Sequence, residues 1–241
     1  MKTADSLIID RRFNGPPDSG NGGYSCGMLA RFIDGPAVVR LRIPPPLDAL
    51  MQVRKTVDGV GLFHQQELVA SAKAAIVDID IPVPPDFAGA EAASLRYRGF
   101  DAHFYPACFV CGPDREHGDG MRVFAGLVGD NKGPQRMVAG TWVPDDSLLD
   151  TSGKVAPEYI WSVLDCPGAY SFPEPANGTI LLGELAVSIK GPVSAAEKCV
   201  VIGWEIGQAG RKHFTGTALF GESGECRAVA HATWFEVPLS S

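Results

Sequence analysis

The sequence lacks a long hydrophobic run. The apolar stretch near its start is only three residues, Leu7-Ile8-Ile9, which is too short for a signal-peptide core or a membrane span. Cysteine is also scarce, with six in 241 residues, and their wide spacing is not that of a disulfide framework. We therefore expect a cytoplasmic protein with reduced thiols and no membrane partner.

Positive charge is in short supply as well. Lysine and arginine total 21 against 28 acidic residues, for a net charge of −7, and the basic residues are dispersed, which excludes an extended nucleic-acid surface. Glycine (28) and proline (19) are abundant, so the chain is divided into short elements. With 45% apolar residues it can bury one large core or two small ones.

Two similar runs of strands follow two short helices, and they predict an internal duplication. A shift of 135 residues places Tyr24 on Tyr159. We therefore expect an α+β fold of two units, each with one helix and about four or five antiparallel strands. The strand-like runs are residues 38–43, 50–57, 61–66 and 67–77 in the first half, and 181–189, 199–206, 212–220 and 226–235 in the second.

The two predicted units are separated by a proline-rich segment. Residues 81–90 contain three prolines and cannot continue a central strand. We expect an N-terminal unit at 1–90, a linker at 91–105 and a C-terminal unit at 106–241. A hairpin of residues 121–125 and 137–143 is predicted to open the second unit.

The stretch Asn21-Gly22-Gly23 predicts a glycine-rich loop that opens into a helix. The free N–H groups of such a helix start can bind a phosphate or polarise a carbonyl oxygen. Gly23 to Gly27 also spell G-x-S-x-G, the nucleophile elbow of serine hydrolases. An elbow must follow a buried strand, but residues 13–20 are loop-like, and only His213 and His231 come late in the chain. A hydrolase based on Ser25 is therefore the less favoured alternative.

Cys108-x-x-Cys111 lies between His103 and His117, and this set could supply three or four metal ligands. A structural zinc site usually shows a second close pair, whereas both histidines here are single. No βαβ pattern follows the cysteines, which disfavours a redox role. We expect a structural loop and assign no metal.

Three segments carry a resemblance to a known family: Cys108-Phe109-Val110-Cys111-Gly112, residues 118–124, and the helix predicted at 155–165. They resemble the hotdog-fold acyl-CoA thioesterase superfamily, in its phenylacetate-pathway-like branch. There the central helix begins with H-G-G and carries an acidic residue nine positions after the histidine. The resemblance covers most of the chain as a tandem, or double, hotdog.

Each half of the chain keeps only part of that family motif. Asn21-Gly22-Gly23 stands at the H-G-G place of the first half, and Ala30 comes nine residues after Asn21. In the second half Ala156-Pro157-Glu158 stands at that place, and Asp165 comes nine residues after Ala156. In the branch resembled, the helix start of one unit faces the helix carboxylate of the other.

The resemblance therefore implies one composite site per chain, which hydrolyses an acyl-CoA thioester. Asp165 would be the base or nucleophile, and Asn21 with the Gly22 and Gly23 amides would stabilise the oxyanion. The opposite combination, Ala156-Pro157 with Ala30, has no carboxylate, and Pro157 has no N–H. We expect that second combination to be inactive.

Further residues are assigned to substrate binding. The coenzyme A phosphates are placed from charge alone, and no metal or redox cofactor is required. Hotdog tandems also suggest a homo-oligomer. The alternative function is an acyl-CoA-binding or structural hotdog without turnover; hydration of an enoyl-CoA is disfavoured because no helix carries a histidine. The assigned residues are Tyr24 and Trp161 on the helices and Arg96, Arg98 and Arg122 for the phosphates.

Overall fold

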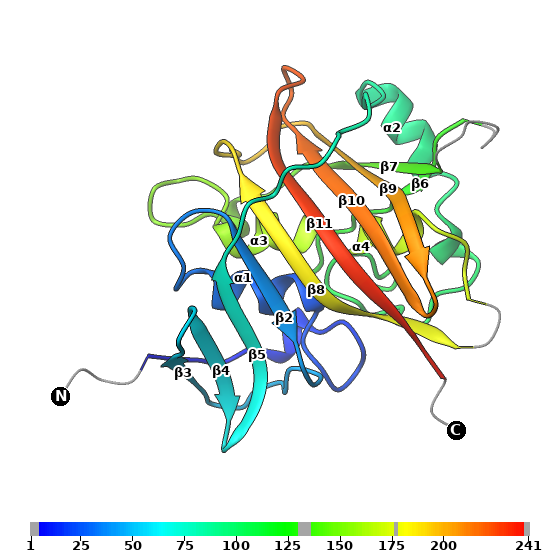
Figure 1. The fold of residues 1–241 in the computed structure, drawn as a ribbon. Helices are drawn as coiled ribbons and strands as arrows, with labels where there is room; N and C mark the ends of the chain where they lie inside the picture. Colours follow the sequence, from blue (N-terminus) through cyan, green and yellow to red (C-terminus); the bar gives the residue numbers. More distant parts are fainter. Residues whose placement is uncertain (1–4, 130–135, 176–177, 239–241) are drawn as a thin grey trace.

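The computed structural model describes residues 5–129, 136–175 and 178–238; the first four residues of the opening segment considered above lie outside these ranges. The described chain forms one antiparallel sheet of 11 strands, in the order β1-β3-β4-β5-β2-β8-β11-β10-β9-β7-β6 (Figure 1). None of the helices within the described ranges has the length and apolarity needed to cross a membrane. The strands are β1 Ser6–Leu7, β2 Ala37–Leu41, β3 Met51–Lys55, β4 Val60–His64, β5 Glu67–Ala74, β6 Gly126–Leu127, β7 Met137–Trp142, β8 Thr179–Ile189, β9 Cys199–Ala209, β10 Lys212–Phe220 and β11 Cys226–Val237.

The sheet repeats one strand order in its two halves. The first half runs β3-β4-β5-β2 and the second β9-β10-β11-β8, so that the two sequences of four strands are equivalent. The halves meet where β2 pairs antiparallel with β8, with Ala37 opposite Val187 and Arg40 opposite Glu184. The α+β class and the two-unit arrangement predicted from the sequence are thus present, joined edge to edge.

The helices at residues 22–30, 157–163 and 166–170 lie against one face of this sheet, and the helix at residues 87–94 packs on the opposite face (Figure 1). The helices at residues 22–30 and 157–163, one from each half, pack against each other. Their close approach requires glycine at two positions four residues apart. A Cβ on Gly23 would lie 2.5 Å from the Cβ of Asp165, and a Cβ on Gly27 would lie 2.7 Å from the Cα of Glu158. The glycines thus allow helix-to-helix contact. The helices are α1 Gly22–Ala30, α2 Phe87–Ser94, α3 Pro157–Val163 and α4 Cys166–Tyr170.

The helix expected over residues 155–165 is two helices, α3 and α4. Pro167 occupies the second position of α4, and because proline has no N–H it cannot continue the hydrogen bonding of α3. The chain therefore turns at Leu164 and Asp165 before the second helix starts. The turn places Asp165 between the two helices rather than on a continuous helical surface.

The strand expected at residues 121–125 is absent. Arg122 has φ of 55°, a left-handed conformation that interrupts an extended strand. The N–H groups of Met121 and Val123 donate to the carbonyls of Phe109 and Val110, so this segment pairs with the loop that contains Cys108 and Cys111, the cysteine loop. The hairpin partner of β7 is instead the short strand β6.

The segment between the halves contains helix α2, which the sequence analysis missed. Asp86 caps it by accepting the N–H of Gly89 at 2.8 Å, and its Ala90 and Ala93 are buried in a cluster with residues of β7 and β9. Because α2 packs on the second half, these contacts favour a boundary between β5 and α2. That boundary is earlier than the linker expected at 91–105.

Candidate active site

Asp165 is buried at the turn between α3 and α4, with 2% of its surface exposed. A strand of its own half holds that turn: the buried hydroxyl of Thr217 on β10 donates to the carbonyl of Leu164 at 2.7 Å. This hydrogen bond satisfies a carbonyl at the end of α3 that has no partner within the helix. The position of the Asp165 backbone is therefore fixed by the sheet.

The start of α1, from the other half, holds one carboxylate oxygen of Asp165. The N–H of Gly23 donates to Oδ2 at 2.8 Å, and Nδ2 of Asn21 donates to the same oxygen at 3.1 Å. Oδ1 of Asn21 accepts the N–H of Tyr24 at 2.9 Å as the helix cap. Because the cap occupies Oδ1, the amide must direct Nδ2 toward the carboxylate.

The second oxygen, Oδ1 of Asp165, is buried and has no hydrogen-bond partner among the described residues. Burial raises the pKa of this carboxyl to about 7, whereas the hydrogen bonds from Gly23 and Asn21 act in the opposite direction. A carboxylate with one oxygen anchored and the other unpartnered is suited to accept a proton or attack an electrophile.

Asp165 lines a cavity of about 100 Å³ between the halves. The half-buried Gly22 lines it too, and within the ranges described no hydrogen bond uses its N–H. Leu182 and Trp234 contribute apolar surface. The cavity thus combines an apolar wall, a carboxylate oxygen and a backbone donor, the pattern of a small-molecule site.

Arg98 is the predicted phosphate-binding residue that lines this cavity. Its guanidinium donates to the carbonyls of Phe172 at 2.8 Å and Ala169 at 3.1 Å, and it lies 4.8 Å from the centre of the Tyr170 ring. These contacts hold the end of α4. The guanidinium of Arg98 therefore binds backbone carbonyls in the wall of the cavity.

The other four predicted substrate-binding residues do not line the cavity. Tyr24 is buried and stacks on Phe13 with ring centres 4.0 Å apart, and Trp161 lines a second cavity. Arg96 donates to the carbonyl of Leu127 at 2.7 Å, and Arg122 donates to the carbonyl of Arg115. The charge of Arg96 and Arg122 did not indicate where their side chains lie.

Ser25 does not have the setting of a nucleophile elbow. It lies inside α1 with 1% exposed, and its hydroxyl donates to the carbonyl of Asn21 at 2.7 Å. The helix follows a loop instead of a strand. His213 contacts Glu236, with 2.7 Å between Nε2 and Oε1. The hydroxyl of Ser25 therefore has no histidine partner among the residues that the structure describes.

A second cavity lies at the equivalent position of the opposite combination. It is lined by Ala30, Ala156, Pro157 and Glu158, and Glu158 lies 3.6 Å from the guanidinium of Arg31. Ala30 offers no carboxylate, and Pro157 offers no N–H. That this cavity is inactive stays a prediction.

An apolar groove continues from the candidate site, and the sequence analysis did not identify it. The groove shares Gly22, Tyr105 and Leu182 with the cavity and extends along Ile43 to Arg42. Arg42 also lines a polar depression with Arg40 and Lys73. The spacing of Arg40 and Arg42 by two residues on a predicted strand puts both on one face, and this signal was available in the sequence.

Comparison with known proteins rests on the fold. No protein-family model matches the chain, and no curated protein matches it in sequence. The tesB protein of Mycobacterium avium subspecies paratuberculosis matches 97% of this chain and 92% of its own, with 12% identity and a TM-score of 0.60. The fold is a double hotdog. A Novosphingobium aromaticivorans protein, provisionally assigned as a thioesterase, matches 96% of this chain and 94% of its own, with 10% identity and a TM-score of 0.59.

A third match covers half of the double hotdog. A Streptococcus mutans protein, solved with acetyl-CoA bound, matches 51% of this chain and 98% of its own, with 17% identity and a TM-score of 0.41. Within the double hotdog, α1 and α3 are the helices of the two units, and β2 and β8 form the junction between them. Asp165 and the start of α1 therefore come from different hotdog units.

Proposed function

We propose that this double hotdog hydrolyses an acyl thioester, with acyl-CoA as the substrate class. The observation that carries the proposal is the arrangement of Asp165. The start of α1 holds Oδ2, while the buried Oδ1 has no hydrogen-bond partner among the described residues. Asp165 lines a cavity at this position. The thioesterase assignment of a full-length structural neighbour supports the same reaction class.

In this mechanism the thioester carbonyl lies beside Gly22. The Gly22 N–H donates to the carbonyl oxygen, and Oδ1 of Asp165 takes a proton from a water molecule that attacks the carbonyl carbon. The negative charge of the tetrahedral intermediate then rests on the oxygen that faces Gly22. Collapse breaks the carbon–sulfur bond, and the proton on Asp165 passes to the leaving thiolate. The products are a carboxylic acid and a free thiol. Direct attack by Oδ1 on the carbonyl carbon is the other route open to this carboxylate.

The N–H groups of Gly22 and Gly23 have different roles in this mechanism. Gly23 uses its N–H to hold Asp165, so its amide positions the carboxylate. Gly22 keeps its N–H for the substrate. The sequence analysis assigned both amides to the oxyanion, and the contact of Gly23 with Asp165 reassigns one of them.

For coenzyme A we propose the apolar groove beside the cavity. Ile43 and the neighbouring prolines would contact the pantetheine arm, and the exposed Arg42 at the groove's end would contact the phosphates. Lys73 would add positive charge, whereas the guanidinium of Arg40 is paired with Glu184 at 2.6 Å. This placement replaces Arg96 and Arg122, whose guanidinium groups donate to carbonyls elsewhere.

The test is release of free thiol from a panel of acyl-CoAs by the purified chain and two variants. Asp165→Asn keeps the shape of the side chain and an oxygen for the Gly23 N–H but removes the base, so turnover falls by about 10²- to 10⁴-fold. Glu158→Gln, at the carboxylate that lines the second cavity, is the matched control and retains turnover. Equal turnover by Asp165→Asn and the unchanged chain would contradict the assignment.

Binding without turnover remains the alternative. Binding without thiol release by the unchanged chain, measured by calorimetry with the same acyl-CoA panel, would favour an acyl-CoA-binding hotdog. Absence of both binding and thiol release would contradict the substrate class itself.

A further inference from the structure

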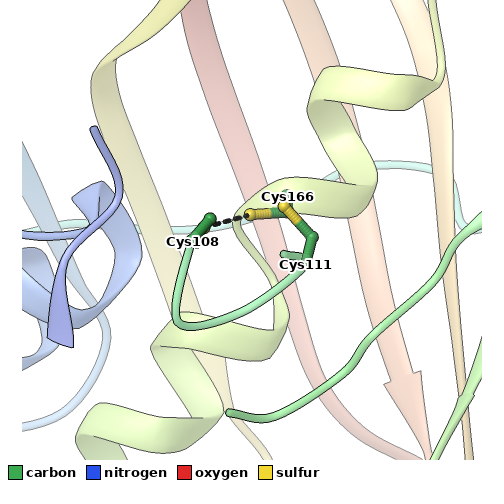
Figure 2. A group of neighbouring side chains, drawn as sticks. All are labelled: Cys108, Cys111 and Cys166. Carbon is green, nitrogen blue, oxygen red and sulfur yellow. Dashed lines mark hydrogen bonds between the residues drawn. The ribbon is translucent and has the colours of Figure 1, made fainter. Parts of the chain in front are cut away.

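Three buried cysteines converge beside the candidate site. Cys108 and Cys111 come from the loop before β6, and Cys166 is the first residue of α4. Their sulfur atoms all lie within 4.8 Å of one another, and those of Cys108 and Cys166 are 4.0 Å apart. Figure 2 shows the three side chains pointing toward a common point.

The separation of the sulfurs matches a metal-binding geometry. A tetrahedral zinc ion with zinc–sulfur bonds of about 2.3 Å places its sulfurs about 3.8 Å apart. The observed spacing is slightly wider, so small side-chain movements would close the three sulfurs around one ion. A disulfide has sulfurs about 2.05 Å apart and accounts for only two of the three cysteines.

The loop is built to present two of the sulfurs together. The N–H of Gly112 donates to the carbonyl of Cys108 at 2.9 Å, which closes a tight turn. A Cβ on Gly112 would lie 2.5 Å from the backbone nitrogen of Cys108, so the turn requires glycine. The turn brings the sulfurs of Cys108 and Cys111 to the same side of the loop, close to the sulfur of Cys166 at the start of α4.

Nitrogen donors surround these sulfurs. Nδ2 of Asn21 lies 3.7 Å from the sulfur of Cys108 and 4.0 Å from that of Cys166, and Nε2 of His103 lies 3.4 Å from the sulfur of Cys111. N–H donors of this kind stabilise thiolate ligands of a metal from outside the coordination sphere.

His103 is therefore a supporting group. Its Nδ1 accepts the N–H of Tyr105 at 2.9 Å, so the neutral ring carries its hydrogen on Nε2 and donates it to the sulfur of Cys111. A nitrogen that carries hydrogen has no lone pair for a metal. His117, which the sequence analysis placed in the same set, is exposed and does not lie with the three cysteines.

We propose that Cys108, Cys111 and Cys166 bind a zinc-class soft divalent ion through three thiolates, with the fourth coordination position facing the cavity. All three cysteines line that cavity together with Asp165. Thiolates favour such ions, and a zinc site with three protein ligands leaves one position for water or another exogenous ligand. Binding releases the thiol protons to solvent, and no oxidant is needed. The proposal differs from the expectation of no metal, and it holds or fails independently of hydrolysis.

The test measures metal directly on the full chain. Protein expressed in zinc-supplemented medium and kept reduced is expected to carry one zinc ion per chain by elemental analysis. Cobalt(II) added to the metal-free chain is expected to give thiolate-to-cobalt charge-transfer absorption and the visible bands of a tetrahedral site. Cys111→Ser and Cys166→Ser abolish both signals, whereas Cys199→Ser, at a buried cysteine on β9, retains them.

Two outcomes would overturn the proposal. One is a reduced chain with neither zinc nor the cobalt spectrum, and the other is retention of both signals by Cys111→Ser and Cys166→Ser. A Cys108–Cys166 disulfide, found by mass spectrometry of chain that binds no cobalt after reduction, would assign the cluster to redox chemistry instead. The cobalt titration of the unchanged chain needs no variant, so it decides even where a variant fails to fold.

Discussion

Gly23 donates its backbone N–H to Oδ2 of Asp165 at 2.8 Å, across 142 residues of sequence. The contact joins the two hotdog units at the carboxylate that the proposed reaction needs. Because Gly23 also lacks a Cβ, the helix of one unit approaches the turn of the other closely enough for this hydrogen bond. Packing and site geometry therefore depend on the same residue.

Gly23→Ala should destabilise the chain strongly. The added Cβ would lie 2.5 Å from the Cβ of Asp165 and 2.8 Å from the carbonyl oxygen of Trp161, so two backbones must separate. We expect a loss of about 3 kcal/mol in the free energy of unfolding, measured by urea denaturation. Gly207→Ala is the control, since a Cβ there meets nothing within 4 Å. Equal effects of the two substitutions would refute the packing argument.

Asn21 has two functions that substitution can separate. Asn21→Ser retains a good helix cap but removes the N–H that holds Asp165, so stability should stay close to that of the unchanged chain while turnover falls about tenfold or more. Asn21→Ala removes both functions and should also cost about 1 kcal/mol of stability. Thiol-release kinetics and thermal unfolding measure the two effects. Full turnover by Asn21→Ser would show that the amide is not needed.

Thr217 should matter although it lies outside the cavity lining. Thr217→Val removes the hydrogen bond to the carbonyl of Leu164 and leaves that carbonyl without a partner, which costs about 1 to 3 kcal/mol. The turn that carries Asp165 loosens, so turnover should fall together with stability. Thr233→Val, on the neighbouring strand β11, is the control. A variant with wild-type unfolding and kinetics would show that the turn is held by other contacts.

Arg42 should affect binding of coenzyme A and leave the chemistry unchanged. Arg42→Ala is expected to raise KM for an acyl-CoA about three- to fivefold, as for an exposed ion pair, with kcat unchanged and a smaller effect at high salt. An acyl-pantetheine without phosphates should show no change in KM. Arg96→Ala serves as the control, because that side chain donates to Leu127. If Arg96→Ala raises KM and Arg42→Ala does not, the proposed phosphate position is wrong.

The sequence predicted most of the strands because their β-branched and apolar runs are continuous. Turns between them were readable from glycine and proline, and the repeat was visible as a helix followed by four strands in each half. The prediction failed where contacts between distant segments override the local pattern. Residues 121–125 look like a strand, but Arg122 is left-handed and its neighbours Met121 and Val123 bond to the cysteine loop. Helix α2 was missed because its burial depends on β7 and β9.

For the candidate site, the sequence by itself determined which residue types are present: a capped helix start at Asn21, an acidic residue before Pro167, and a C-x-x-C loop. Only the tertiary structure decided which of them meet. It brought Asp165 to Gly23, assigned the Gly23 amide to the carboxylate, placed Cys166 beside Cys108, and left Arg96 and Arg122 elsewhere. The physical reason is that helix starts and turns are local properties of a few residues. Contacts between the two hotdog units depend instead on sheet register and on how closely glycine lets the helices pack.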